Sequence, residues 1–151
     1  MRKNLFQLFD SLRCLGSERR LKISTKTRYG LRLMIDVAQN QGDGCVALKD
    51  IAHRQDISKK YLEQVVNPLV SAHLLMVTRG PQGGYRLARR PEEITLDEIV
   101  SASEDGLELL ACTADAKCCQ RAEDCVSRRV WGGLQESINT FLSGQTLAEI
   151  L

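Results

Sequence analysis

Four cysteines lie close together in one short segment of the chain, ACTADAKCCQRAEDC. Their spacing is Cys112-x5-Cys118-Cys119-x5-Cys125, so they fall within fourteen residues, among small and charged neighbours. Thiolates bind soft metal ions, and an iron–sulfur cluster is held by about four such ligands. The segment therefore predicts a metal or redox site rather than a chance grouping of small residues.

Two other uses of these thiols stay open. Structural zinc sites usually pair cysteines about two to four residues apart, so the five-residue gaps on either side of Cys118 and Cys119 fit zinc poorly. Oxidation of that vicinal pair, or of another, would make the segment a thiol switch without metal. Cys14 and Cys45 lie outside the segment and are predicted to be incidental.

The composition indicates a globular protein of a reducing compartment. Charged residues make up 26% of the 151 residues and the hydrophobic set 43%, which is typical of a folded chain. Residues 1–20 are the only candidate secretion signal, and Gln7, Asp10 and Arg13 interrupt them. No apolar run approaches the roughly 18 residues that cross a bilayer. We therefore expect a cytoplasmic protein without a membrane partner, in which clustered thiols do not form a disulfide framework.

Charge is distributed unevenly along the chain. Residues 21–100 carry twelve Lys and Arg against nine Asp and Glu, whereas residues 101–151 carry four against eight. The excess of basic residues in 21–100 is consistent with a part of the chain that contacts phosphates, and 101–151 is acidic. Such a contrast in charge is not specific by itself.

The elements that must position these residues follow from caps and periodicity. Helices are expected over residues 25–39, 48–54 and 96–103, the last opened by the capping box of Thr95 and Glu98. A tight turn at residues 55–57 leads to a further helix capped by Ser58, which completes a helix-turn-helix pattern. Two short strands flank the turn Gly80–Gly84, and the cysteine segment is expected to be loop. The predicted fold class is mainly α with a small β-wing: a winged helix-turn-helix domain followed by a long C-terminal helix.

The front half carries residue types that suit DNA. In a winged helix the second helix enters the major groove, and a basic wing reaches the minor groove. Residues at the start of the second helix, on the first helix and around the wing are candidates for base or phosphate contacts: Arg28, Lys59, Lys60, Tyr61, Glu63, Gln64, Arg79, Arg86, Arg89 and Arg90. Each also has a plainer interpretation, a solvated surface for the lysines and Glu63 and core packing for Tyr61.

Three stretches resemble one known family closely. TKTRYGLRLMIDVA, DIAHRQDISKKYLEQVV and VTRGPQGGYRLAR are similar to the corresponding parts of the winged-helix regulators typified by the iron–sulfur regulator IscR and its nitric-oxide-sensing relative NsrR. The resemblance runs from Leu21 to the end of the chain. It leaves out residues 1–20, which form either a short amphipathic helix or an extension that begins at too early a start codon.

The resemblance implies a homodimer on double-stranded DNA. By position, Lys60, Glu63 and Gln64 would lie in the major groove and Arg79 in the minor groove, and the long C-terminal helix would be the dimerisation seam. An independent observation agrees, because an apolar stripe spaced by four along an exposed helix requires a partner. The stripe consists of Val130, Leu134, Ile138 and Leu142.

The resemblance also implies an iron–sulfur cluster in the loop before that helix. The family's three cysteine ligands match Cys112, Cys118 and Cys125 with one inserted residue, or Cys119 in the middle place. The chain departs from the family at two positions, since Arg128 stands where IscR-like proteins place a histidine and Arg28 where NsrR-like proteins offer a carboxylate. The fourth ligand is therefore open: Cys119 first, then Asp124 or Glu123, or a group of the partner chain.

These inferences combine into one expectation. Residues 1–20 are an extension, 21–103 the winged helix, 104–125 the cluster-binding loop, and 126–151 the dimerisation helix and tail. We expect a transcriptional regulator, not an enzyme, that takes no small-molecule substrate and whose DNA affinity responds to an iron–sulfur cluster reporting iron, redox state or nitric oxide. The alternatives are a thiol-based redox repressor without metal and a scaffold that carries a metal cluster without binding DNA.

Overall fold

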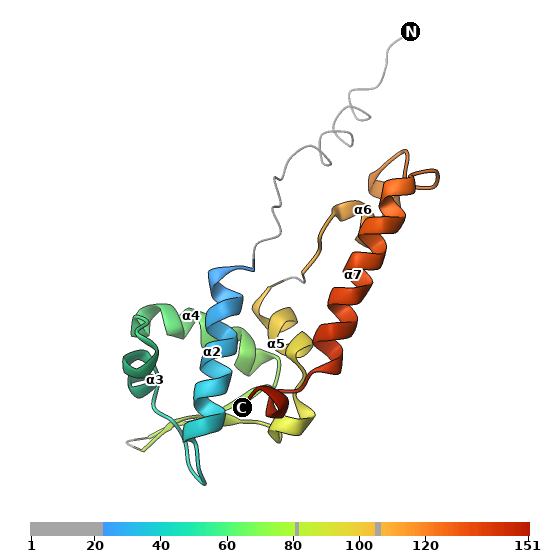
Figure 1. Ribbon diagram of the computed structural model, residues 1–151. Coiled ribbons are helices and arrows are strands. Elements are labelled where there is room, and N and C mark those ends of the chain that lie inside the picture. The colour runs from blue at the N-terminus through green and yellow to red at the C-terminus, as the bar shows by residue number, and fades with distance from the viewer. Residues whose placement is uncertain (1–22, 81, 105–106) are drawn as a thin grey trace. The chain divides into compact units, whose positions relative to one another are not determined.

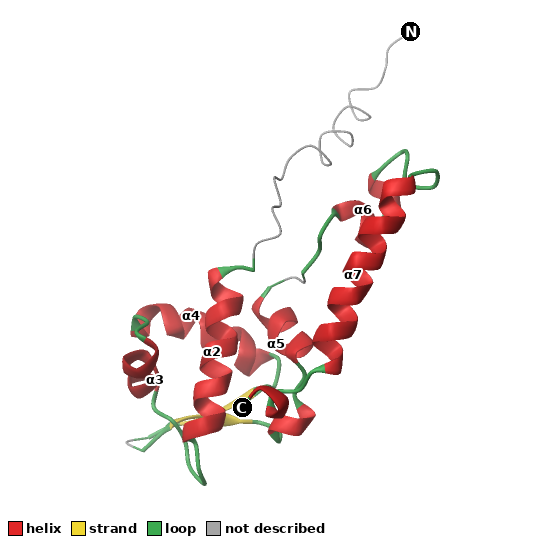
Figure 2. Cartoon of the chain, in the orientation of Figure 1, coloured by secondary structure: helices red, strands yellow, loops and turns green. Residues whose placement is uncertain are grey.

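The computed structural model describes residues 23–80, 82–104 and 107–151, so the predictions made for residues 1–20 and for Cys14 lie outside the described residues. Helices dominate these residues, and the strands form one small antiparallel sheet (Figure 2). The elements run in the order α2 (Thr25–Asn40), α3 (Leu48–Gln55), α4 (Lys59–Ser71), β1 (Leu75–Thr78), β2 (Gly84–Leu87), η1 (Pro91–Glu93), α5 (Leu96–Ser103), α6 (Ala111–Ala114), η2 (Ala116–Cys118), α7 (Val126–Gly144) and η3 (Ala148–Ile150) (Figure 1). The predicted fold class, mainly α with a small β-wing, is confirmed.

Side-chain caps fix where the front helices begin. The hydroxyl groups of Ser24, Ser58 and Thr95 accept hydrogen bonds from backbone amides in the first turns of α2, α4 and α5. The helix-turn-helix turn is closed by Asp56, which ends α3 in the left-handed conformation with φ 52°. Asp is one of the few residues that adopt this conformation readily. Helix α4 continues past Pro68 and ends at Ser71.

The wing depends on close backbone packing at two glycines. Strand β1 pairs with β2 in a register that sets Leu75 opposite Leu87 and Thr78 opposite Gly84. A Cβ atom at Gly84 would collide with the Val46 carbonyl, and one at Gly83 with the Thr78 carbonyl. Backbone atoms cannot swing aside as side chains do, so both glycines of the GGY motif are required by the wing itself.

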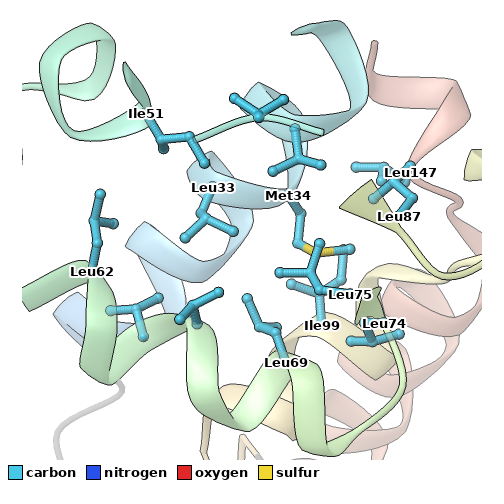
Figure 3. Packing of buried hydrophobic residues seen from close by; sticks show 14 of the residues in the cluster. Leu33, Met34, Ile51, Leu62, Leu69, Leu74, Leu75, Leu87, Ile99 and Leu147 are labelled. Carbon is cyan, nitrogen blue, oxygen red and sulfur yellow. The ribbon is translucent and has the colours of Figure 1, made fainter. Parts of the chain in front are cut away.

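One hydrophobic core unites the winged helix and the end of the chain. Helix α2 packs against α3, α4 and α5, and the largest fully buried side chains lie where these helices and the strands meet (Figure 3). Leu147, in the C-terminal tail, is 0% exposed and belongs to this core. Its backbone amide donates to the Ile94 carbonyl at 2.8 Å, and Thr146 bridges to Thr95. The tail is thus an integral part of the winged-helix unit.

The described residues form two compact units, residues 23–107 with 139–151 and residues 108–138. The second contains α6, η2 and the greater part of α7. The prediction of loop for the cysteine segment was wrong in part, since Ala111–Ala114 forms a short helix and Ala116–Cys118 a 3-10 turn. Within the part of the chain that is described, no helix is long and apolar enough to cross a membrane.

A buried carboxylate joins the first two helices of the DNA-binding unit. The side chain of Asp36, on α2, is 2% exposed and accepts from Arg54 Nε at 3.0 Å and from Gln55 Nε2 at 2.9 Å. Burial raises the pKa of Asp36, but the hydrogen bonds from Arg54 and Gln55 and the charge of Arg54 outweigh it, so the pKa lies below its ordinary value. The carboxylate therefore stays ionised and fixes the end of α3 against α2.

We predict that Asp36→Asn lowers the free energy of unfolding by about 2–3 kcal/mol near neutral pH, because it takes a charged hydrogen-bond acceptor from Arg54. The folded pKa is depressed, so this stabilisation is complete above the unfolded value of about 3.9 and is lost as pH falls through the folded value. Urea unfolding of both proteins should therefore differ most near neutral pH and converge below about pH 4. Asp43→Asn, at an exposed loop position, is the control and should leave stability unchanged at either pH.

Candidate nucleic-acid interface and cysteine segment

The start of α4 presents a polar, exposed surface. Lys59, Lys60, Glu63 and Gln64 are all exposed on this helix, whose opposite face is buried in the core. Lys59 Nζ lies 3.8 Å from the Glu63 carboxylate, and both side chains are more than half exposed, so the pair adds little stability and is easily parted. These are the residues that a major-groove helix offers to base edges and phosphates.

Tyr61 has a different position from its predicted neighbours. It is half-buried, packs against the core, and meets Tyr29 of α2 edge to face with ring centroids 5.6 Å apart. The plainer interpretation of this residue, core packing, is therefore supported. Tyr61 thus joins α4 to α2.

Two arginines flank that aromatic pair on α2. The guanidinium carbons of Arg28 and Arg32 lie 5.9 and 5.4 Å from the centroid of the Tyr29 ring. Both arginines are exposed, and Arg32 Nε also donates to Gln55 Oε1 at 2.9 Å, beside the helix-turn-helix turn. Arg32 was missed in the sequence, although its spacing of four from Arg28 could have indicated it. Both cations are placed to extend the basic surface from α4 onto α2.

The wing adds two further exposed cations. Arg79 follows β1, and Arg86 on β2 lies opposite Met76 in the register. Burial and, after it, the negative charge of Glu63 raise the pKa of Tyr85 on β2. Helix α4 also packs against strand β1 of the wing.

Arg89 and Arg90 are engaged within the protein instead. Arg89 donates to the carboxylate of Glu98 at 2.6 Å, and Arg90 to that of Glu93 at 2.9 Å. Their guanidinium groups hold the segment after the wing against η1 and α5. Of the wing arginines, Arg79 and Arg86 are therefore the better candidates for phosphate contacts.

The four clustered thiols are distributed over one compact unit. Cys112 lies on α6, Cys118 ends η2, Cys119 follows it, and Cys125 directly precedes α7; all four are half-buried. Among the described residues, no three His, Cys, Asp or Glu side chains converge as metal ligands. As a donor set the thiols fit an iron–sulfur cluster, but holding one would require the segment to draw them together.

Arg128 braces the cysteine segment through hydrogen bonds to two backbone carbonyls. Its Nε donates to the Cys112 carbonyl at 2.7 Å and its Nη1 to the Ala122 carbonyl at 3.4 Å. The guanidinium therefore ties both ends of the cysteine segment to the first turn of α7. The Cys125 Sγ lies 3.2 Å from the Ser127 hydroxyl, and hydrogen bonds from Ser127 and from the Arg128 amide lower the pKa of this thiol.

Helix α7 carries a large exposed apolar surface. None of its residues is buried. Val130 is 65% exposed, Leu134 42% and Phe141 63%. The predicted stripe is divided in the structure, because Leu142 packs against the core of the winged-helix unit and Ile138 is half-buried. The exposed large hydrophobic residues of α7 are Val126, Val130, Trp131, Leu134 and Phe141.

Comparison with known proteins agrees with this architecture. Residues 23–151 match the model of the Rrf2 family, described as an iron-dependent transcriptional regulator. The HTH-type transcriptional regulator IscR of Aliivibrio salmonicida is 37% identical over 131 residues, which are 87% of this chain and 77% of that protein.

Solved structures share the fold as well. CymR, the global cysteine regulator of B. subtilis, is 36% identical with a TM-score of 0.73, and the match covers 87% of this chain and 96% of that one. IscR of T. potens is 38% identical with a TM-score of 0.69, covering 89% of this chain and 88% of that one. One relative is thus named an HTH-type transcriptional regulator, and another a global cysteine regulator.

Proposed function

The chain belongs to the Rrf2 family of transcriptional regulators, and we propose that it binds operator DNA as a homodimer whose affinity is set by an iron–sulfur cluster on its cysteine segment. One observation carries the proposal: four half-buried thiols lie in the segment directly before α7, a helix that exposes large apolar side chains. We infer that this segment is the ligand site and that α7 is the dimer seam.

The DNA contacts divide between two kinds of residue. Lys60, Glu63 and Gln64 at the start of α4 provide hydrogen-bonding groups for base edges, which carry sequence information. Arg28, Arg32, Arg79 and Arg86 provide cations for phosphates or a narrow minor groove. Because each neutralised phosphate releases counterions, affinity should fall steeply as salt rises.

The cysteine segment would hold the cluster through Cys112, Cys118 and Cys125, with Cys119 as fourth ligand. When bound, the cluster supplies a centre whose presence depends on iron and on oxidants. Arg128 cannot serve as a ligand, but it keeps the Cys112 carbonyl attached to α7. A movement that brings the thiols together would therefore displace the first turn of α7 through this hydrogen bond.

Transmission to DNA requires two arrangements of the dimer with different affinities for cluster and operator. Helix α7 starts beside Cys125 and ends at Gly144, directly before a tail whose Leu147 is buried in the winged-helix core. The covalent path from thiol to DNA-binding unit is thus one helix and one anchored residue. A shift of α7 changes how its exposed apolar residues meet the partner, and with that the spacing of the two recognition helices.

A single charged substitution on α7 tests whether this helix forms the dimer interface. We predict that Val130→Glu weakens dimerisation at least about 100-fold, because it places a carboxylate in an apolar interface on both subunits. Sedimentation equilibrium should show a monomer at concentrations where the wild type is a dimer. Ser143→Glu, which adds the same charge at an exposed position of α7 outside the apolar surface, should leave the dimer intact. A dimer unaffected by Val130→Glu would place the seam elsewhere.

A thiol switch without metal is the second candidate function. It is favoured by the similarity to a regulator described as a global cysteine regulator. In this case a disulfide between two of the thiols would replace the cluster as the signal.

Purification without oxygen separates the two candidates. The cluster proposal requires broad visible absorption near roughly 320–420 nm, with iron and acid-labile sulfide present in matching amounts. A colourless protein that lacks sulfide even after anaerobic reconstitution would refute it. The thiol switch would then be tested by counting free thiols before and after mild oxidation.

A further inference from the structure

A cavity opens beside Cys125 in the unit that carries the cysteines. Its volume is about 330 Å³, and its lining includes Cys125, Glu123, Arg128 and Arg129. This size lies at the lower end of the range for sites that hold small organic molecules. The cavity therefore combines a thiol with charged groups and room for a ligand.

The charges in the lining favour an anion. The lining contains two basic residues, Arg128 and Arg129, and one acidic residue, Glu123. Two N–H groups of Arg128 already donate to the carbonyls of Cys112 and Ala122. Arg129 is exposed, and no acidic side chain of the described residues forms an ion pair with it. Its guanidinium is the group available to a carboxylate of the ligand.

We propose that this cavity binds an anionic low-molecular-weight disulfide and that Cys125 exchanges with it to form a mixed disulfide. The sulfur of Cys125, having given up its proton, attacks one sulfur of the small disulfide. A new S–S bond forms, the original S–S bond breaks, and the departing thiolate takes up a proton. No further oxidant is required, because the small disulfide is itself reduced by the exchange.

The inference concerns protein without a cluster and does not depend on the proposed function. A metal-free thiol regulator and the cluster-free form of an iron–sulfur regulator would both expose the same cavity. The ligand contributes two features that the lining can recognise, a disulfide bond and carboxylates at a distance from it. A peptide-like disulfide with free carboxyl groups has this chemistry.

The test compares three disulfides on reduced, cluster-free, full-length protein. Oxidised glutathione carries carboxylates, hydroxyethyl disulfide is neutral and cystamine is cationic. After short incubation and quenching with N-ethylmaleimide, trypsin separates the thiols, since AEDCVSR contains Cys125 alone while Cys118 and Cys119 share CCQR. We expect the Cys125 peptide to carry the glutathione adduct first. The measured quantity is the ratio of the Cys125 rate with glutathione disulfide to its rate with hydroxyethyl disulfide. We expect this ratio to be larger in folded protein than in urea-unfolded protein.

Charge variants identify the cavity as the cause. Arg129→Gln should slow the glutathione reaction at Cys125 about three- to five-fold and leave the hydroxyethyl reaction unchanged. Glu123→Gln should accelerate the glutathione reaction. Lys117→Gln removes an exposed cation of the same segment that does not line the cavity, and should have no effect on the ratio.

Two results would overturn the proposal. One is equal preference for the three disulfides in folded and unfolded protein, which would make Cys125 an ordinary accessible thiol. The other is equal slowing by Arg129→Gln and Lys117→Gln, which would assign the preference to the general charge of the segment. Either result would leave the iron and sulfide measurements unaffected.

Discussion

Replacing Lys60 and Glu63 together with alanine is expected to weaken operator binding at least about 100-fold. A good base contact contributes about 1–3 kcal/mol of discrimination, and a dimer on a two-fold operator loses each contact twice. The double change removes one cation and one anion, so the net charge of the chain is unaltered. A loss of affinity therefore cannot arise from weaker long-range attraction to DNA.

Both side chains are exposed on α4 and neither belongs to the hydrophobic core, so the variant should fold and melt as the wild type does. Fluorescence anisotropy on operator fragments selected from genomic DNA would give the two dissociation constants. Glu92→Ala, at an exposed position of η1 outside α4, is the surface control; it removes one negative charge and should not weaken binding. Unaltered binding by the double variant would show that α4 does not read DNA and would favour a cluster-carrying scaffold.

The second large effect is expected at Cys112. Cys112→Ala should abolish cluster retention, because a cluster with one of about four ligands missing loses much of its protection from solvent. The brace from Arg128 to this residue uses the backbone carbonyl, so alanine preserves it and removes the thiol alone. Iron, sulfide and visible absorption of the anaerobically purified variant provide the measurement.

Cys45→Ala serves as the control for the general effect of losing a thiol. Cys45 lies in the winged-helix unit, where its sulfur is 3.3 Å from the Thr78 hydroxyl, far along the chain from the cysteine segment. This variant should retain full iron and sulfide. Full retention by Cys112→Ala would remove Cys112 from the ligand set, and a disulfide that persists in that variant would support the thiol switch instead.

Much of the winged helix could be predicted because its signals are local. The caps Ser24 and Ser58 and the box of Thr95 and Glu98 fixed where helices begin, and each is present in the structure. The RGPQGGY stretch predicted the wing turn, and contacts at Gly83 and Gly84 give the physical reason. Interactions of this kind span a few residues and leave a trace in the sequence.

Features that depend on distant partners could not be predicted in the same way. The pairing of Asp36 with Arg54 joins two helices, and nothing in either residue's neighbourhood indicates it. Tyr61 was a candidate for DNA contact with core packing as its alternative, and its ring meets Tyr29. Leu142 matched the spacing of the dimer stripe, yet it packs on the core. In each case the structure adds a contact with a residue distant in the sequence, and periodicity alone did not identify that contact.

The arrangement of the thiols is a fourth such feature. Spacing placed Cys112, Cys118, Cys119 and Cys125 in one segment, and the structure keeps them in one unit without bringing them together as ligands. As donors the four thiols suit an iron–sulfur cluster. In the structure they are not gathered around one point, so cluster binding would have to draw them together. Whether binding at this segment is coupled to DNA is therefore the central question about this protein.

The most direct test measures operator affinity twice on one preparation, before and after anaerobic removal of its iron and sulfide. The coupling proposed here predicts dissociation constants that differ by about five- to 150-fold, the range of a typical allosteric coupling. Cys112→Ala should behave as the cluster-free form in both measurements. Equal affinity of loaded and stripped protein, with loading confirmed by iron and sulfide, would contradict regulation of DNA binding by the cluster.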